Sequence, residues 1–174
     1  DGFCYAFDPV AKEDEEGFLV FPEIWKFDCN LPEYRNDEDG NPIKYATFDG
    51  PSECIATPVV DDGKVYISIG QDPEHGEGLG HVYRIDATKT GDVSPVAADG
   101  KPNPNSGQIW HLGGIDEDGS QTGEAGAEAF RRTLSTAAIA GDLVYLPDLS
   151  GRIHCMDAET GRRYWEADVL AALW

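Results

Sequence analysis

Basic residues are scarce in this chain: 13 Lys and Arg stand against 33 Asp and Glu, and the formal net charge is −20 at pH 7. Nucleic acids and anionic membranes are bound by clusters of Lys and Arg, so this composition argues against both as partners. The acidic residues gather in expected loops, for example at positions 13–16 and 37–39. A solvated acidic surface explains them most simply, and binding of divalent cations is the alternative.

Long apolar stretches are also missing. No run of about 18 apolar residues occurs, so we expect no transmembrane helix and no membrane insertion. Hydrophobic residues still make up 40% of the 174 residues, which is enough for the core of one domain or of part of one. The chain has no G-x-S-x-G motif, and scattered Ser, His and Asp residues define no triad, so no catalytic residue is assigned.

Cysteine is sparse as well. The four residues Cys4, Cys29, Cys54 and Cys155 form no C-x-x-C pattern, which argues against a zinc site or haem attachment. Cys4 and Cys155 fall in expected strands, where a small buried residue is the ordinary interpretation. Cys29 and Cys54 bracket one expected connection between repeats. We therefore hypothesise a Cys29–Cys54 disulfide, which would suit an exported protein, although spacing alone does not fix the partners.

What the sequence does contain is an internal repeat. Residues 57–67 match residues 136–146 in pattern, and residues 80–88 match residues 151–159. Each copy then ends on a short segment that contains a tryptophan. Short strands repeated with turn residues at fixed offsets are typical of radially repeated β architectures.

The repeated unit predicts four short strands. Residues 135–139, 143–146, 152–156 and 162–165 have strand character and are separated by turns that contain Asp and Gly. Four antiparallel strands cannot bury both of their faces alone, so copies must stack around an axis as blades. We therefore expect an all-β fold, a partial β-propeller of four-stranded antiparallel blades.

The repeat count gives two full blades, one partial blade and the start of another. The expected segments are the second half of a blade (1–28), an interblade loop (29–53), a complete blade with insertions (54–112), an interblade loop (113–132), a complete blade (133–168) and the start of the next blade (169–174). Propellers usually close with about four to eight blades, so this chain cannot close alone. We expect a piece of a longer precursor, completed by further blades of the same protein or by a partner chain. The lack of a signal peptide then says nothing about export.

Two motifs resemble those of a known family. Residues 56–67 (ATPVVDDGKVYI) and 156–165 (MDAETGRRYW) resemble the repeat of the pyrroloquinoline-quinone-like (PQQ-like) β-propeller family. The resemblance covers most of the chain outside the insertions and implies the propeller fold. The inserts at 70–78 and 103–106 are similar to those of large secreted propellers from planctomycete-type bacteria.

The resemblance bounds the function only broadly, because the family includes quinoprotein dehydrogenases, noncatalytic assembly scaffolds and uncharacterised secreted proteins. It implies a periplasmic or secreted protein. Family dehydrogenases place adjacent cysteines over the quinone and a catalytic Asp beside calcium. Here no two cysteines are adjacent and no such Asp can be matched, so PQQ is not expected within this segment. We expect a noncatalytic binding or scaffolding segment; the alternatives are a segment of a PQQ-dependent quinoprotein oxidoreductase and a propeller that binds a metal or a haem-protein partner.

The insertions hold the candidate metal ligands. His75, Glu77 and His81 occur together in a glycine-rich insert, and imidazole with carboxylate suits a transition metal. Asp116 and Asp118, in the stretch DEDGS, are candidate calcium ligands, and residues 37–41 (DEDGN) are a weaker candidate. Both stretches lack EF-hand ligands at two positions. Hydrated loops and ordinary Asp-Gly turns are the simpler interpretation throughout.

The repeat also predicts the core. The expected blade cores are Val59, Val65, Ile67, Val82, Ile85, Ile139, Val144, Leu146, Ile153 and Met156. Trp25, Trp110 and Trp165 recur at one blade position, so we expect them to pack between neighbouring blades, where burial of a large ring contributes most.

Overall fold

The computed structural model of the chain describes residues 2–30, 35–44, 51–70, 72, 74, 80–113 and 130–173. These residues form strands and turns and no helix, which confirms the all-β prediction, and none of their segments is a helix able to cross a membrane. The strands are β1 (Phe3–Phe7), β2 (Lys12–Glu13), β3 (Leu19–Val20), β4 (Glu23–Asp28), β5 (Val59–Asp61), β6 (Lys64–Ile69), β7 (His81–Asp86), β8 (Gly91–Asp92), β9 (Gln108–Gly113), β10 (Ala138–Ala140), β11 (Leu143–Pro147), β12 (Arg152–Asp157) and β13 (Arg163–Asp168).

Strands β10 to β13 form a complete antiparallel blade in the spatial order β10-β11-β12-β13. The turn between β10 and β11 holds Gly141 at φ +60°, a left-handed conformation that glycine adopts without steric cost. In the turn between β12 and β13, the Asp157 carboxylate accepts hydrogen bonds from the amides of Glu159 and Thr160. These are the turns that the Asp and Gly positions of the repeat predicted.

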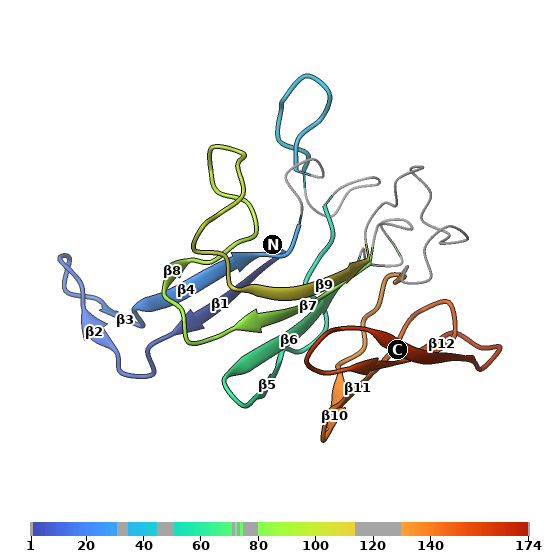
Figure 1. Cartoon of the computed structure of the whole chain (residues 1–174). Helices are drawn as coiled ribbons and strands as arrows, with labels where there is room; N and C mark the ends of the chain where they lie inside the picture. The colour runs from blue at the N-terminus through green and yellow to red at the C-terminus, as the bar shows by residue number, and fades with distance from the viewer. Residues whose placement is uncertain are drawn as a thin grey trace.

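Strands β5, β6, β7 and β9 form a second complete blade, whose central strands β6 and β7 are buried on both faces. Alternate residues of a strand point to opposite faces. In β6, Val65, Ile67 and Ile69 therefore join one hydrophobic cluster with the first blade, while Tyr66 joins another with the third blade. Figure 1 shows β6 and β7 between the pair β1 and β4 on one side and β11 and β12 on the other. This stacking confirms the partial propeller.

The first blade is represented by β1 and β4, which pair antiparallel, with the short β8 added in parallel beside β4. Strand β8 belongs to the long insert of the second blade, so this insert reaches across to the neighbouring sheet. Strands β2 and β3 form a separate two-stranded hairpin that projects beyond β1 and β4 (Figure 1).

Most of the predicted blade core is buried. The buried members are Val65, Ile67, Val82, Ile85, Val144, Leu146 and Met156. Val59 and Ile139 are only partly buried because they lie in β5 and β10, the edge strands of their sheets. Ile153 is also partly buried, and it lies on the face of β12 opposite to Met156.

Candidate functional site

Among the predicted metal ligands, His81 lies within the described residues, whereas His75, Glu77, Asp116 and Asp118 lie outside them. His81 begins β7 and pairs with Ile69 and Gly113 in the sheet ladder. Its side chain is completely buried in the blade. The metal sites proposed at the other four positions stay predictions.

The partner of His81 is a second histidine, His111 of β9. Nδ1 of His81 lies 2.8 Å from Nε2 of His111, and both rings stack with Tyr83. Burial, reinforced by the neighbouring His111, lowers the pKa of His81 to about 3, and burial lowers the pKa of His111 to about 4. Both imidazoles are therefore neutral near pH 7, and one ring donates its N–H to the other. In the part of the chain that the structure describes, no group of three His, Cys, Asp or Glu side chains could hold a metal ion.

The acidic stretch 37–41 forms a turn closed by its own carboxylate. Oδ1 of Asp37 accepts hydrogen bonds from the amides of Asp39 and Asn41, at 3.0 and 2.8 Å, and Gly40 has φ +81°. The hydrogen bond from the Asn41 amide is the main cause that lowers the pKa of Asp37. Because backbone amides already occupy this carboxylate, the structure favours the turn over a cation site.

The hypothesised cysteine pair is brought together by the fold. Cys29 is buried, with its Sγ 3.9 Å from the carbonyl oxygen of Phe27, and Cys54 packs against the same hydrophobic cluster. Both are free thiols in the structure, as are Cys4 and Cys155. The disulfide itself therefore stays a prediction, and the fold brings both residues to one cluster.

A buried carboxylate–imidazole pair lies in the third blade, where the sequence predicted no site. Nε2 of His154 lies 2.8 Å from Oδ2 of Asp148, and an Arg163 nitrogen lies 3.3 Å from Nδ1 of the same ring. Burial raises the pKa of Asp148, but hydrogen bonds from His154, Ser150 and the Arg152 amide outweigh burial and lower it overall. Since both ring nitrogens have protein partners, this pair ties the turn before β12 to the strand.

Trp110 joins the second blade to the third. Its ring is 7% exposed, and its Nε1–H donates to the carbonyl oxygen of Ala158 at 3.0 Å. The Tyr66 hydroxyl donates to the same carbonyl at 3.4 Å. Gly161 lies so close that a Cβ there would be 2.7 Å from the Trp110 ring. The turn 157–161 is thus the docking element for the tryptophan of the preceding blade.

The other two tryptophans differ in their surroundings. Trp25 is buried between the first and second blades, as expected. Trp165 is 47% exposed, so its predicted packing between blades is wrong for the described part of the chain. The physical reason is that no blade described here lies against that face of the third sheet. Trp165 contacts Tyr145 of its own blade, with ring centroids 6.0 Å apart, and Tyr164 beside it is also exposed.

The long insert of the second blade acts as a clasp between blades. Val93 is buried in the cluster shared with the first blade, and its amide donates to the carbonyl of Lys26 at 2.9 Å. Ser94 Oγ accepts a hydrogen bond from the amide of Asp28. Inside the insert, the Asn103 amide group donates to the carbonyls of Asp92 and Ser94. Residues 103–106, which the sequence marked only as an insert, thus support this clasp.

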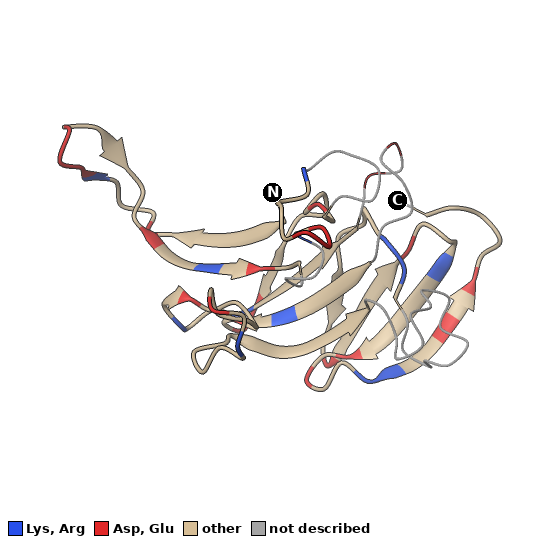
Figure 2. Ribbon diagram, turned by 90° about the horizontal axis from the view of Figure 1, so that it is seen from above, with Lys and Arg blue, Asp and Glu red and all other residues tan. Residues whose placement is uncertain are grey.

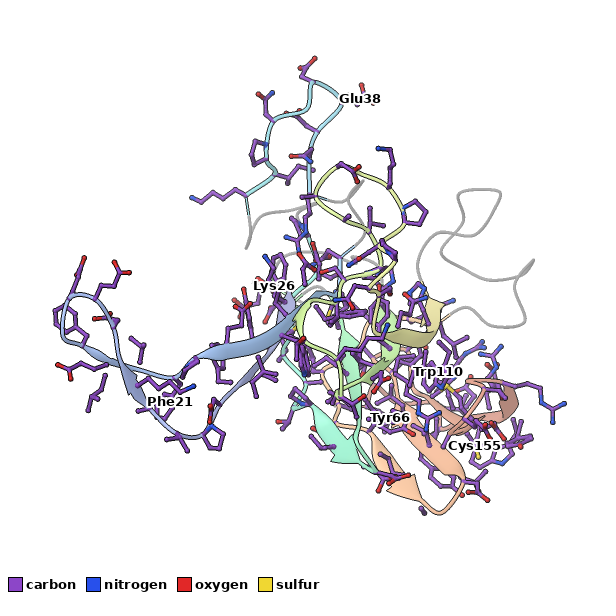
Figure 3. The ribbon with its side chains drawn as sticks, turned by 60° about the vertical axis from the view of Figure 1, so that its left-hand side comes forward. Phe21, Lys26, Glu38, Tyr66, Trp110 and Cys155 are labelled. Atoms are coloured by element: carbon purple, nitrogen blue, oxygen red, sulfur yellow. The ribbon has the colours of Figure 1, made fainter. Side chains whose placement is uncertain are left out.

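An exposed apolar arm is the clearest candidate contact surface. We define the arm by its exposed apolar residues on and beside the β2–β3 hairpin: Phe7, Val10, Phe18, Leu19, Val20 and Phe21. Leu19 is 77% exposed, and Figure 3 shows Phe21 on the hairpin, away from the blades. An isolated two-stranded hairpin is only marginally stable in water. Grouped exposed apolar residues mark interaction surfaces, whereas single ones are ordinary.

The tip of the arm is acidic. Residues 13–16 carry four carboxylates, and Figure 2 shows the end of the projecting hairpin in the colour of Asp and Glu. Asp14 closes the turn by accepting hydrogen bonds from the amides of Glu16 and Phe18, at 3.0 and 2.8 Å. The arm therefore combines apolar sides with a negatively charged end, which would complement an apolar surface flanked by basic residues.

No protein-family model matches the sequence, and no curated protein matches it. Solved structures do match. BamB from Moraxella catarrhalis is similar with a TM-score of 0.50 and 13% sequence identity, over 97% of this chain and 33% of BamB. The chain thus spans about a third of the length of BamB, and similarity at this identity shows the fold alone.

Two dehydrogenase structures match at lower TM-scores. Quinohemoprotein alcohol dehydrogenase from Comamonas testosteroni matches with a TM-score of 0.36 and 26% identity, over 66% of this chain and 13% of that one. A europium-containing methanol dehydrogenase matches with a TM-score of 0.35 and 20% identity, over 68% and 18%. None of these supports the narrower resemblance to planctomycete-type proteins. The chain has the fold of part of a β-propeller, similar to BamB.

Proposed function

We propose that this chain is a noncatalytic binding or scaffolding segment of an exported β-propeller protein, and that it acts through protein contacts. The observation that carries the proposal is the apolar arm, which groups six exposed apolar residues at the end of β1 and on the hairpin beyond it. The alternatives of a quinoprotein oxidoreductase segment and a metal- or haem-partner-binding propeller stay predictions.

The open face of the third blade supports the same function. Trp165 presents aromatic surface at the position where Trp110 of the second blade is covered by a neighbouring turn. We infer that a further blade, or a partner chain that supplies an equivalent turn, covers this face. The arm then remains available for a different protein, because it projects from the opposite end of the described blades (Figure 1).

Site-specific photocrosslinking in the native source tests this function. A photoreactive phenylalanine analogue at Leu19 should crosslink one discrete protein, and the same analogue at Asp142 is the control. Asp142 is also exposed, but it lies in the turn between β10 and β11, far from the arm in the fold. A Leu19-specific crosslink that is lost when Phe18 and Phe21 are both changed to serine supports the proposal. Equal crosslinking from both positions, or none from Leu19, contradicts it.

A further inference from the structure

Three of the four cysteines lie together where the first blade meets the second. Cys4 on β1 and Cys29 after β4 belong to one buried hydrophobic cluster, and Cys54 packs against that cluster. Cys4 is paired with Phe27 across the β1–β4 ladder. Cys29 is two residues beyond Phe27 on the same face, so Cys4 and Cys29 are diagonal neighbours. Cys29 and Cys54 meet at the same cluster from the two ends of the connection between the first and second blades, and each thiol perturbs the pKa of the other.

Backbone clamps fix the positions of Cys29 and Cys54. The Asn30 side chain bridges to residue 52 in both directions: Oδ1 accepts the Ser52 amide at 2.9 Å, and Nδ2 donates to the Ser52 carbonyl at 2.8 Å. The Cys29 amide donates to the carbonyl of Gly2 at 2.9 Å. These bonds hold the backbone one or two residues from each thiol. A disulfide needs Cα atoms about 4.4–6.8 Å apart, and these clamps hold together the two backbone segments that carry Cys29 and Cys54.

The thiols differ in access and acidity. Cys54 is partly exposed, whereas Cys29 is completely buried and Cys4 nearly so. The neighbouring Cys29 thiol lowers the pKa of Cys54, while burial raises the pKa of Cys4 to about 12 and that of Cys29 well above its ordinary value. Thiolates are the attacking species in disulfide exchange, so Cys54 is the thiol that reacts first.

We propose that Cys54 and Cys29 form a thiol–disulfide exchange site that is oxidised by a disulfide compound, which leaves as two thiols. The Cys54 thiolate attacks one sulfur of the oxidant, whose S–S bond breaks and whose leaving sulfur takes up a proton. Cys29 then loses its proton, attacks the Cys54 sulfur and releases the second oxidant thiol. Two electrons and two protons pass to the oxidant, and the new bond locks the connection between the first and second blades. Cys4, which lies diagonally across the ladder, stays a thiol.

A thiolate metal site would be the competing use of three neighbouring cysteines. Within the described ranges, however, no three such side chains are arranged to hold a metal ion. Disulfide exchange needs only two neighbouring thiols, and Cys29 and Cys54 lie at one cluster.

Oxidised glutathione is a direct probe of the site. The native protein is equilibrated with it, remaining thiols are alkylated after unfolding, and the peptides are mapped by mass spectrometry. We expect one disulfide that joins Cys29 to Cys54, with Cys4 and Cys155 alkylated. This measurement uses the unmodified chain, so it does not depend on the folding of any variant. A disulfide that contains Cys4, or four thiols that remain free, would overturn the proposal.

The order of the two steps is tested with matched variants. In Cys29→Ser, no thiol can attack the mixed disulfide between Cys54 and glutathione, so we expect one glutathione to remain attached to Cys54. In Cys155→Ser, the control, the Cys29–Cys54 bridge should form as in the unmodified chain. With a small thiol reagent under native conditions, Cys54 should react at least about tenfold faster than Cys155, because reactivity follows exposure and thiolate fraction. Glutathione attached to Cys155 but not to Cys54 would also overturn the proposal.

Discussion

Replacing Trp110 with alanine should weaken the junction between the second and third blades much more than the same change at Trp165. The two tryptophans occupy the same position in successive blades, so the substitution, the strand and the turn chemistry are matched. Only the neighbour differs: Trp110 lies against the turn 157–161, whereas Trp165 is open to solvent.

The magnitude follows from the exposed fractions, 7% for Trp110 and 47% for Trp165. A tryptophan side chain buries up to roughly 250 Å², so the difference of 40 percentage points is about 100 Å². At about 25 cal/mol per Å², this area is worth about 2.5 kcal/mol. The lost Nε1–H hydrogen bond adds only about 0.5–1 kcal/mol, because the Tyr66 hydroxyl still donates to the Ala158 carbonyl. Trp110→Ala should therefore cost about 3 kcal/mol more than Trp165→Ala.

Urea unfolding of the 174-residue chain, followed by circular dichroism, measures both free energies of unfolding. The slope of the free energy of unfolding against urea concentration must agree among the unmodified chain and the two variants, since a change would mean that unfolding is no longer two-state. Losses that agree within 1 kcal/mol for Trp110→Ala and Trp165→Ala would refute the described packing of the second blade on the third.

Other changes test other contacts. Gly161→Ala should destabilise by more than Gly141→Ala in urea unfolding, because both glycines have positive φ but only at Gly161 would a Cβ strike the Trp110 ring; equal losses would contradict this contact. Asn103→Ala should cost about 3 kcal/mol, because it removes two hydrogen bonds that the side chain donates to carbonyls of the clasp and one that it accepts from the Asn105 amide; Lys101→Ala, whose ammonium forms an exposed ion pair with Asp99, should cost little. His81 and His111 have pKa values lowered to about 3 and about 4, so both are buried as neutral rings. The stability that depends on these neutral rings is fully present above pH 6.5 and is lost as pH falls, because the unfolded chain then binds protons that the folded chain does not. Between pH 8 and pH 5, each histidine should lower the free energy of unfolding by about 2 kcal/mol. His111→Gln should flatten that pH dependence, and an unchanged slope would show that the pair is not buried as described. Formation of the Cys29–Cys54 disulfide should raise the free energy of unfolding by about 3.5 kcal/mol, from closure of a 26-residue loop in the chain-entropy treatment, and dithiothreitol should remove that gain.

The repeat pattern predicted the blades because turn geometry and the alternation of buried and exposed residues along a strand are local requirements that a short sequence shows. The backbone geometry of the turns favours Asp157, whose carboxylate accepts amide hydrogen bonds, and Gly141, which has a left-handed φ. Both residues can be recognised in the sequence as turn residues. The alternating residues of β6 and β12 likewise predicted a buried core. The burial of Val59 and Ile139 was overestimated, since the sequence pattern alone does not show that β5 and β10 lie at sheet edges.

What the sequence did not reveal depends on contacts between distant segments. His111 pairs with His81 only because the register of β7 and β9 brings them together, 30 positions apart. The clasp formed by Val93 and Ser94 is similar: nothing near 91–94 in the sequence indicates a strand that pairs with β4. The exposure of Trp165 was also missed, because the repeat implies a neighbour for every blade and does not say which neighbours are present.

Oxidative footprinting of Trp165 tests the partial-propeller interpretation most directly. The protein isolated from its native source and the isolated 174-residue chain are exposed to hydroxyl radicals, and oxidation of Trp165 is compared with that of Trp110. We expect Trp165 to react readily in the isolated chain and to be as protected as Trp110 in the native form, because a further blade or partner covers the open face. Equal, high oxidation of Trp165 in both forms would contradict that interpretation.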